Sequence, residues 1–136
     1  MDVTTNVEID AMAKSANELV AEANAAIDKV EVAGAKALLN REDVVFVDVR
    51  EGSEVAKGKI PGAVHVPRGV LEFIADPTSP LHNEALSSGK HLLVYCASGG
   101  RSALAGKTLK DMGAKQVTNM LGGINAWREA GGDIES

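Results

Sequence analysis

The sequence predicts one α/β domain in which helices cover both faces of a mostly parallel sheet. Its 136 residues fit a single domain, and 45% of them are hydrophobic, which is enough to fill one core. Short apolar runs alternate along the chain with segments of helical periodicity, as in parallel strands joined by crossover helices. The runs are continuously apolar and β-branched, which is typical of strands buried on both faces.

The same periodicity gives the order of the elements. Strands are expected at 44–48, 64–66, 92–95 and 116–119, and helices or helical turns at 35–40, 53–57, 69–75, 83–86, 102–112 and 124–130. Pro77 and Pro80 exclude regular structure between 76 and 80. Asp48 and Cys96 each end a strand, and we therefore expect them to share one edge of the sheet.

Residues 8–30 are predicted to form a helix outside this alternation, so the chain divides into a helical extension, 1–30, and the α/β domain, 31–136. Apolar side chains recur at spacings of three and four: Met12, Ala16, Leu19, Ala23, Ile27 and Val30. Packing on the domain surface is the favoured interpretation, because a short Ala-rich helix is marginal alone. A dimer or partner contact is the alternative.

Composition excludes several classes of function. The net charge of −5 and the lack of a basic cluster argue against nucleic acid, and no apolar run is long enough to span a membrane. The amino terminus lacks a signal-peptide pattern, so a cytoplasmic protein is expected. One cysteine and three dispersed histidines predict neither a disulfide nor a metal site, and we expect no cofactor.

Cys96 is the candidate nucleophile. It follows an apolar strand and precedes a Gly-rich loop and a helix, whose amides and positive end favour a thiolate. The alternative is a buried cysteine acting as a small hydrophobe, but this does not explain two glycines and an arginine within five residues. The candidate substrate-binding residues are Ala97, Ser98, Gly99, Gly100 and Arg101.

Arg101 has two expected roles. Its guanidinium is a permanent cation that can bind an anionic substrate through two parallel hydrogen bonds. The alternative is a structural role, in which Arg101 fixes the loop by pairing with a carboxylate. The two roles are compatible.

The spacing within the loop separates two chemistries. Cysteine phosphatases of the protein-tyrosine type place five residues between cysteine and arginine, whereas four separate Cys96 from Arg101. The shorter loop predicts a cradle too tight for phosphate and sized for a single sulfur atom. The run Cys-Ala-Ser-Gly-Gly-Arg at 96–101 resembles the active loop of single-domain rhodaneses, which are sulfurtransferases.

Three further segments resemble rhodanese motifs in the right order. Residues 45–51 resemble a strand ending in Asp-Val-Arg-Glu, 58–67 resemble a Gly-His-Ile-Pro-Gly-Ala segment, and 121–127 resemble a closing Gly-Gly-x-x-x-Trp motif. With the cysteine loop they cover about residues 30 to 131. The resemblance implies a rhodanese-like fold of three layers.

The resemblance also implies a reaction. Cys96 would carry sulfur as a persulfide from a small anionic donor, such as thiosulfate or a polysulfide, to a thiol or cyanide, and a protein thiol is a further candidate acceptor. One alternative is a persulfide-carrying or thiol-sensing interaction module with little turnover alone. Another is a phosphatase or arsenate reductase, against which the loop length argues. A dithiol reductase would need a second cysteine, which the chain lacks.

Asp48, Arg50 and Arg68 are candidates for the rim of the site or for its structural support. A carboxylate beside the thiolate would raise its pKa, so Asp48 is expected to accept hydrogen bonds rather than to act as a base. Arg50 is expected either to pair with Glu51 or to screen the site. Arg68 follows a strand end and could line the same mouth, or it is an ordinary exposed arginine.

Overall fold

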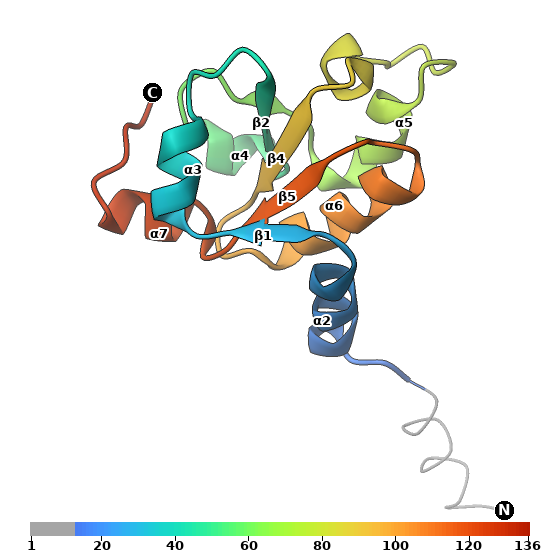
Figure 1. Cartoon of the computed structure of the whole chain (residues 1–136), viewed down its shortest axis with the longest axis horizontal. Helices are drawn as coiled ribbons and strands as arrows, with labels where there is room; N and C mark the ends of the chain where they lie inside the picture. Colours follow the sequence, from blue (N-terminus) through green and yellow to red (C-terminus); the bar gives the residue numbers. More distant parts are fainter. Residues whose placement is uncertain (1–12) are drawn as a thin grey trace, which may run out of the picture.

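A computed structural model describes residues 13–136, which form a five-stranded sheet with helices on both faces (Figure 1). The strands lie in the order β1-β5-β4-β2-β3, and every neighbouring pair is parallel. Their bounds are Asp28–Val30 for β1, Val44–Asp48 for β2, Val64–His65 for β3, His91–Tyr95 for β4 and Val117–Met120 for β5. This architecture confirms the predicted fold class.

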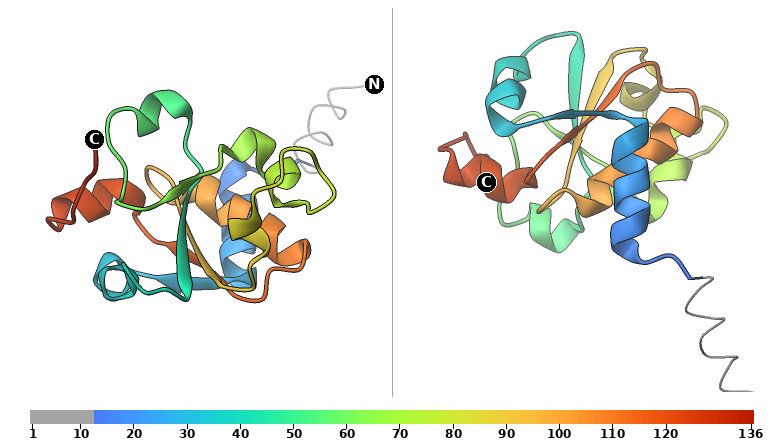
Figure 2. Two further views of the ribbon diagram at one scale, coloured as in Figure 1. Left: turned by 90° about the horizontal axis from the view of Figure 1, so that it is seen from above. Right: turned by 60° about the horizontal axis from the view of Figure 1, so that its bottom comes forward.

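Two groups of helices enclose the sheet (Figures 1 and 2). Their bounds are Ala16–Ala26 for α2, Val32–Leu38 for α3, Gly52–Val55 for α4, Leu71–Ala75 for α5, Gly100–Asp111 for α6 and Gly123–Glu129 for α7, with 3₁₀ turns η1 at Arg68–Val70 and η2 at Glu84–Ser87. On one face, α5 and α6 bury Leu71 and Leu109 against Val94 of β4. On the other face, α3 and α7 enclose a cluster that includes Phe46 and Trp127.

The central strands determine where the functional site lies. The side chains of β4 are fully buried from Leu92 to Tyr95, as expected of a strand covered on both faces. Asp48 of β2 is in register with Tyr95, the residue before Cys96. The carboxyl ends of β2 and β4 therefore lie side by side, as the sequence predicts.

The helix predicted over 8–30 was wrong at its carboxyl-terminal end. Ser15 caps α2 in a capping box with Glu18, and the helix ends at Ala26. Ile27 is extended, and residues 28–30 form the edge strand β1 beside β5. Helical spacing cannot reveal this strand, because its hydrogen-bond partners lie about 90 residues further along the chain. Residues 8–12, with Met12, lie outside the described residues.

The predicted surface packing of this segment is observed for α2. The helix packs against α6, and its Ala23 is buried, whereas Leu19 is 43% exposed. The other predicted elements are present, with ends shifted by up to three residues. No helix in residues 13–136 is long and apolar enough to cross a membrane.

Candidate active site

The Cys96 sulfur lies between the end of β4 and the first turn of α6. The residue is only 1% exposed. Its Sγ accepts a hydrogen bond from the Gly99 amide at 3.1 Å and lies 3.4 Å from the Ser102 hydroxyl oxygen. Gly99 has a left-handed φ of +114°, a conformation in which glycine is strongly favoured. This conformation belongs to the turn from which the Gly99 amide reaches the sulfur.

The surroundings of Cys96 favour its thiolate. Burial opposes ionisation, but the Ser102 hydroxyl and the amides of Ser102, Gly99 and Ser98 outweigh it, so that the pKa of the Cys96 thiol is lowered. The amino-terminal end of α6 adds a positive partial charge on the same side. The site therefore holds more of the nucleophilic form than a cysteine in water at the same pH.

The start of α7 holds the outer side of the loop. The amides of Ile124 and Asn125 donate to the carbonyl oxygens of Cys96 and Ala97 at 2.9 and 3.1 Å. A Cβ at Gly123 would lie 2.5 Å from both carbonyl oxygens, so the backbones approach this closely only because residue 123 is glycine. The N–H groups of the same two peptide units belong to Ala97 and Ser98. Because the carbonyls point towards α7, these N–H groups point away from α7, towards the interior of the loop.

Arg101 makes the carboxylate contact that was its expected structural role. Its two terminal nitrogens donate to the two Glu54 carboxylate oxygens at 2.7 and 2.9 Å. The pair ties the start of α6 to α4. The Arg101 side chain is still 39% exposed, so the pair with Glu54 does not bury it.

The Arg101–Glu54 pair makes stability depend on acidity. Hydrogen bonding from Arg101 lowers the Glu54 pKa from 4.5 to about 2. A lowered native-state pKa stabilises the fold above the ordinary pKa, and the contribution is lost as pH falls through the native value. In urea denaturation, we expect the stability lost in Glu54→Gln to be largest above pH 5, to decrease as the pH falls, and to disappear below about pH 2. Glu129→Gln, at an exposed position of α7, is the matched control.

The partner of Arg50 is Asp48, and the expectation of a pair with Glu51 was wrong. The Arg50 Nε and Nη2 donate to the two Asp48 carboxylate oxygens at 3.0 and 2.8 Å, and both side chains are at least 96% buried. Residues two apart on extended backbone point to the same side, whereas Glu51 is exposed and caps α4. Arg50 also donates to the Gly58 carbonyl at 2.8 Å, and Asp48 accepts from the Arg50 amide at 3.0 Å.

The remaining predicted residues lie at different depths. Ser98 is exposed at the mouth, Gly99 is buried, and Ala97 and Gly100 are half-buried. The Arg68 guanidinium donates hydrogen bonds to the Glu72 carboxylate at 3.2 Å and to the Thr108 hydroxyl at 3.4 Å. Both of these partners are outside the cysteine loop.

Two residues were missed by the sequence analysis: Ser102, which approaches the sulfur, and Asn119, which contacts Ser102. Ser102 and Asn119 are both fully buried, and the Ser102 Oγ lies 2.7 Å from Asn119 Oδ1. The available signals were a hydroxyl residue directly after Arg101 and a polar asparagine in a strand whose neighbours are all buried. A buried amide needs hydrogen-bond partners, and here one partner is the hydroxyl that approaches Cys96.

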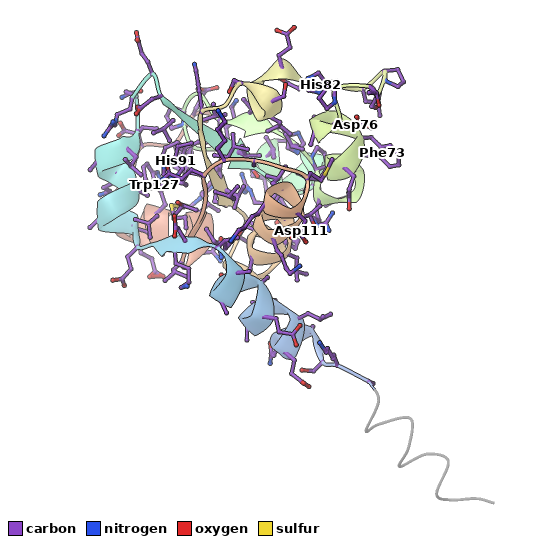
Figure 3. The ribbon with its side chains drawn as sticks, turned by 45° about the vertical axis from the view of Figure 1, so that its right-hand side comes forward. Phe73, Asp76, His82, His91, Asp111 and Trp127 are labelled. Atoms are coloured by element: carbon purple, nitrogen blue, oxygen red, sulfur yellow. The ribbon has the colours of Figure 1, made fainter. Side chains whose placement is uncertain are left out.

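His82 and His91 lie away from this site, whereas His65 is in register with Asp48 and its Nε2 lies 2.8 Å from the Arg50 carbonyl oxygen. His82, labelled with His91 in Figure 3, lies between the Ile74 carbonyl and the Ser87 hydroxyl, and His91 contacts the Thr118 hydroxyl at 2.7 Å. Within residues 13–136, no group of histidine, cysteine, aspartate and glutamate side chains could hold a metal ion.

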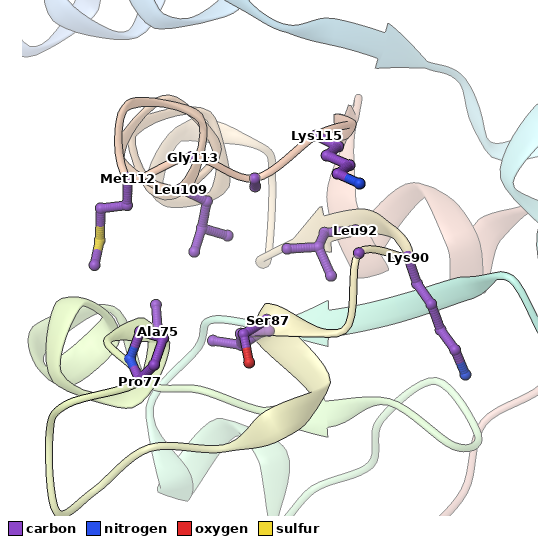
Figure 4. A pocket seen from close by; sticks show the side chains of 12 residues that line it. Ala75, Pro77, Ser87, Lys90, Leu92, Leu109, Met112, Gly113 and Lys115 are labelled. Atoms are coloured by element: carbon purple, nitrogen blue, oxygen red, sulfur yellow. The ribbon is translucent and has the colours of Figure 1, made fainter.

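Two hollows differ in their relation to Cys96. One, of about 260 Å³, borders Ala97 between α4 and α7 and is lined by Arg50, Glu54, Lys57, Ala97, Ile124, Asn125 and Arg128. The other, of about 190 Å³, lies at the opposite end of β4, with Leu92 and Leu109 in its wall and Lys90 and Lys115 beside it (Figure 4). Only the first lies next to the cysteine loop.

Comparison with known proteins identifies the family. The model of the family described as "Rhodanese-like domain" matches residues 31–130. The chain belongs to the rhodanese-like domain family. The match includes the cysteine loop and ends just after α7, and it confirms the resemblance drawn from the motifs.

Relatives of this rhodanese-like domain carry names of two kinds. A protein of Allochromatium vinosum described as a sulfurtransferase is 34% identical over 69% of this chain and 80% of its own length. The thiosulfate:glutathione sulfurtransferase of Saccharomyces cerevisiae is 35% identical over 72% of this chain and 76% of its own. A solved structure from Rhodopseudomonas palustris, described as a protein of unknown function and possible tyrosine phosphatase, is 44% identical. The superimposed region covers 91% of this chain and 96% of the Rhodopseudomonas chain, and the TM-score is 0.87.

Proposed function

We propose that this rhodanese-like domain is a sulfurtransferase that carries sulfane sulfur as a persulfide on Cys96. The observation that supports this most directly is the Sγ of the single cysteine, which accepts the Gly99 amide at 3.1 Å inside a loop with four residues between Cys96 and Arg101. The thiol pKa is lowered there, which favours the nucleophilic thiolate over the thiol. Relatives named as sulfurtransferases support the same reaction class.

In the first half-reaction, the Cys96 thiolate attacks the outer sulfur of an anionic donor such as thiosulfate. A bond forms between Sγ and this sulfur, the sulfur–sulfur bond of thiosulfate breaks, and sulfite leaves with the electron pair. The negative charge of the enzyme moves from Sγ to the terminal sulfur of the persulfide. Inward-facing amides of the loop stabilise this terminal sulfur, as in other anion holes. The exposed part of Arg101 attracts the sulfonate group of the donor.

In the second half-reaction, cyanide or a thiol takes the terminal sulfur and regenerates the thiolate. The acceptor's electron pair forms the new bond, and the bond between the two persulfide sulfurs breaks towards Sγ. The hollow beside Ala97 is the proposed approach. Lys57 and Arg128 line it, while Arg50 and Glu54 in its wall are each paired with an opposite charge. Its positive charge favours an acceptor that carries a carboxylate as well as a thiol.

The phosphatase description of the Rhodopseudomonas relative makes phosphate ester hydrolysis the second candidate. The four-residue spacing argues against it, because a phosphoryl group needs amides around three oxygens rather than around one sulfur. Two assays on the same protein separate these functions. We expect thiocyanate from thiosulfate and cyanide, and at most background hydrolysis of an aryl phosphate.

Protein alkylated with iodoacetamide is the control for both assays, because Cys96 is its only thiol. Hydrolysis of the aryl phosphate that alkylation abolishes, without thiocyanate formation, would replace sulfur transfer by the phosphatase function.

A further inference from the structure

A chain of hydrogen bonds connects the Cys96 sulfur to α2, a helix outside the segment that matches the family model. Ser102 Oγ lies 3.4 Å from Cys96 Sγ and 2.7 Å from Asn119 Oδ1. The Asn119 side-chain nitrogen donates to Asn24 Oδ1 on α2 at 2.9 Å and to the Gly99 carbonyl at 3.2 Å. The helix also passes close to the loop, since a Cβ at Gly100 would lie 3.9 Å from Val20 Cγ2.

These contacts fix the direction of the Asn119 amide. Both of its N–H groups meet acceptor oxygens, so its own oxygen must face Ser102. A reversed amide would place that oxygen against the Asn24 and Gly99 oxygens, with no proton between them. Asn24 therefore helps to keep an acceptor, rather than a donor, in front of the Ser102 hydroxyl.

The Ser102 hydroxyl has one proton and two acceptors within reach. When Cys96 is a thiolate, the more favourable hydrogen bond of the Ser102 hydroxyl is the one donated to Sγ. When Cys96 is a thiol or the inner sulfur of a persulfide, Sγ is uncharged. The more favourable hydrogen bond of the Ser102 hydroxyl is then the one donated to Asn119 Oδ1. Ser102 is buried and pointed at both atoms, so only a rotation of the hydroxyl hydrogen separates the two states.

We propose that Asn24 and Asn119 are positioning residues that give the Ser102 hydroxyl a second place to donate, and so set the ionisation of Cys96 through α2. The proposal rests on the proposed role of Cys96 as the sulfur nucleophile. By competing for the Ser102 proton, Asn119 stabilises the uncharged sulfur relative to the thiolate. Loosening Asn119 leaves Ser102 free to donate to the thiolate and lowers the Cys96 pKa.

The charges near Cys96 stay constant in this comparison. Arg101 on α6 faces the sulfur and is paired with Glu54 on α4, and Asp48 and Arg50 at the end of β2 are paired with each other. Lys57 and Arg128 line the hollow beside the loop. The contacts contributed by α2 and β5 come from neutral asparagines. A change at residue 24 that alters the Cys96 pKa therefore acts through hydrogen bonds.

The test is a pH titration of thiolate absorbance near 240 nm in the intact protein. The signal belongs to Cys96 alone, since it is the single cysteine, and burial raises the pKa of the single tyrosine, Tyr95, well above its ordinary value. For Asn24→Ala we expect the Cys96 pKa to fall by about 0.3 to 1 unit, the size of one redistributed hydrogen bond. Asn24→Asp keeps an acceptor oxygen and adds a negative charge that disfavours the thiolate, so both effects should keep the pKa from falling.

Two controls make the result specific. Asn17→Ala makes the same change two turns earlier at an exposed position of α2, and should leave the titration unchanged. In a Ser102→Ala background, Asn24→Ala should have no effect. A wild-type titration in Asn24→Ala, a raised pKa, or a shift that persists without the Ser102 hydroxyl would overturn the proposal. The titration uses no sulfur donor, so failure of Cys96 to take up sulfur would instead count against the proposed function.

Discussion

Replacing Cys96 with serine should reduce the transfer of sulfur from thiosulfate to cyanide by roughly a thousandfold or more, because the reaction loses its covalent intermediate. A serine hydroxyl stays protonated in this site, because an alcohol is a far weaker acid than a thiol. Its oxygen also cannot carry sulfane sulfur as a persulfide. The measurement is the steady-state rate of thiocyanate formation for both proteins at equal concentration.

The fold should survive this replacement. Serine is slightly smaller than cysteine, and its oxygen can accept the Gly99 amide that now meets Sγ at 3.1 Å. Circular dichroism and the melting temperature are therefore expected to change little. A Cys96→Ser protein that keeps its transfer rate would show that another group carries the sulfur.

Replacing Arg50 with methionine should lower the free energy of unfolding by about 3 to 5 kcal/mol, since it leaves the Asp48 carboxylate buried without its cation. The exposed fractions are 4% for Arg50 and 0% for Asp48, so water cannot compensate. The Gly58 carbonyl would also lose the guanidinium that it accepts from at 2.8 Å. Urea denaturation measures the loss.

Two further variants identify the cause of this loss. Asp48→Leu combined with Arg50→Met removes both charges and should recover part of the stability lost in the single variant. Arg41→Met breaks the exposed pair between Arg41 and Asp43 and should leave the urea midpoint nearly unchanged. If Arg50→Met unfolded at the wild-type urea concentration, the buried pair would contribute nothing to stability.

Local sequence predicted those parts of the protein that depend on neighbours in the chain. The apolar run before Cys96 gave β4, and the glycines after it gave the turn whose Gly99 amide meets Sγ. The fold class followed from the alternation of strands and helices, and all strand pairs are parallel. These features are encoded within segments of about ten residues, and sequence patterns report them directly.

Features that depend on contacts distant in sequence were missed or left open. Strand β1 forms because it pairs with β5, which lies far along the chain. The local spacing of its residues continues a helical pattern, and they were therefore predicted as helix. The choice of Asp48 as the partner of Arg50 depends on how the chain turns after β2 and buries both side chains. The contact of Asn24 with Asn119 joins residues 95 apart, and no local pattern indicates it. Tertiary packing decides each of these, which explains why the support of the site was harder to predict than its nucleophile.

The most direct test of the proposed chemistry is the intact mass of the protein before and after thiosulfate, followed by cyanide. We predict a gain of one sulfur atom in the wild-type protein, its absence in Cys96→Ser, and its loss as thiocyanate when cyanide is added. A gain that cyanide removes only slowly would favour the sulfur-carrying module over the enzyme. An unchanged mass after both thiosulfate and polysulfide would contradict the persulfide on Cys96, and with it the proposed sulfurtransferase function.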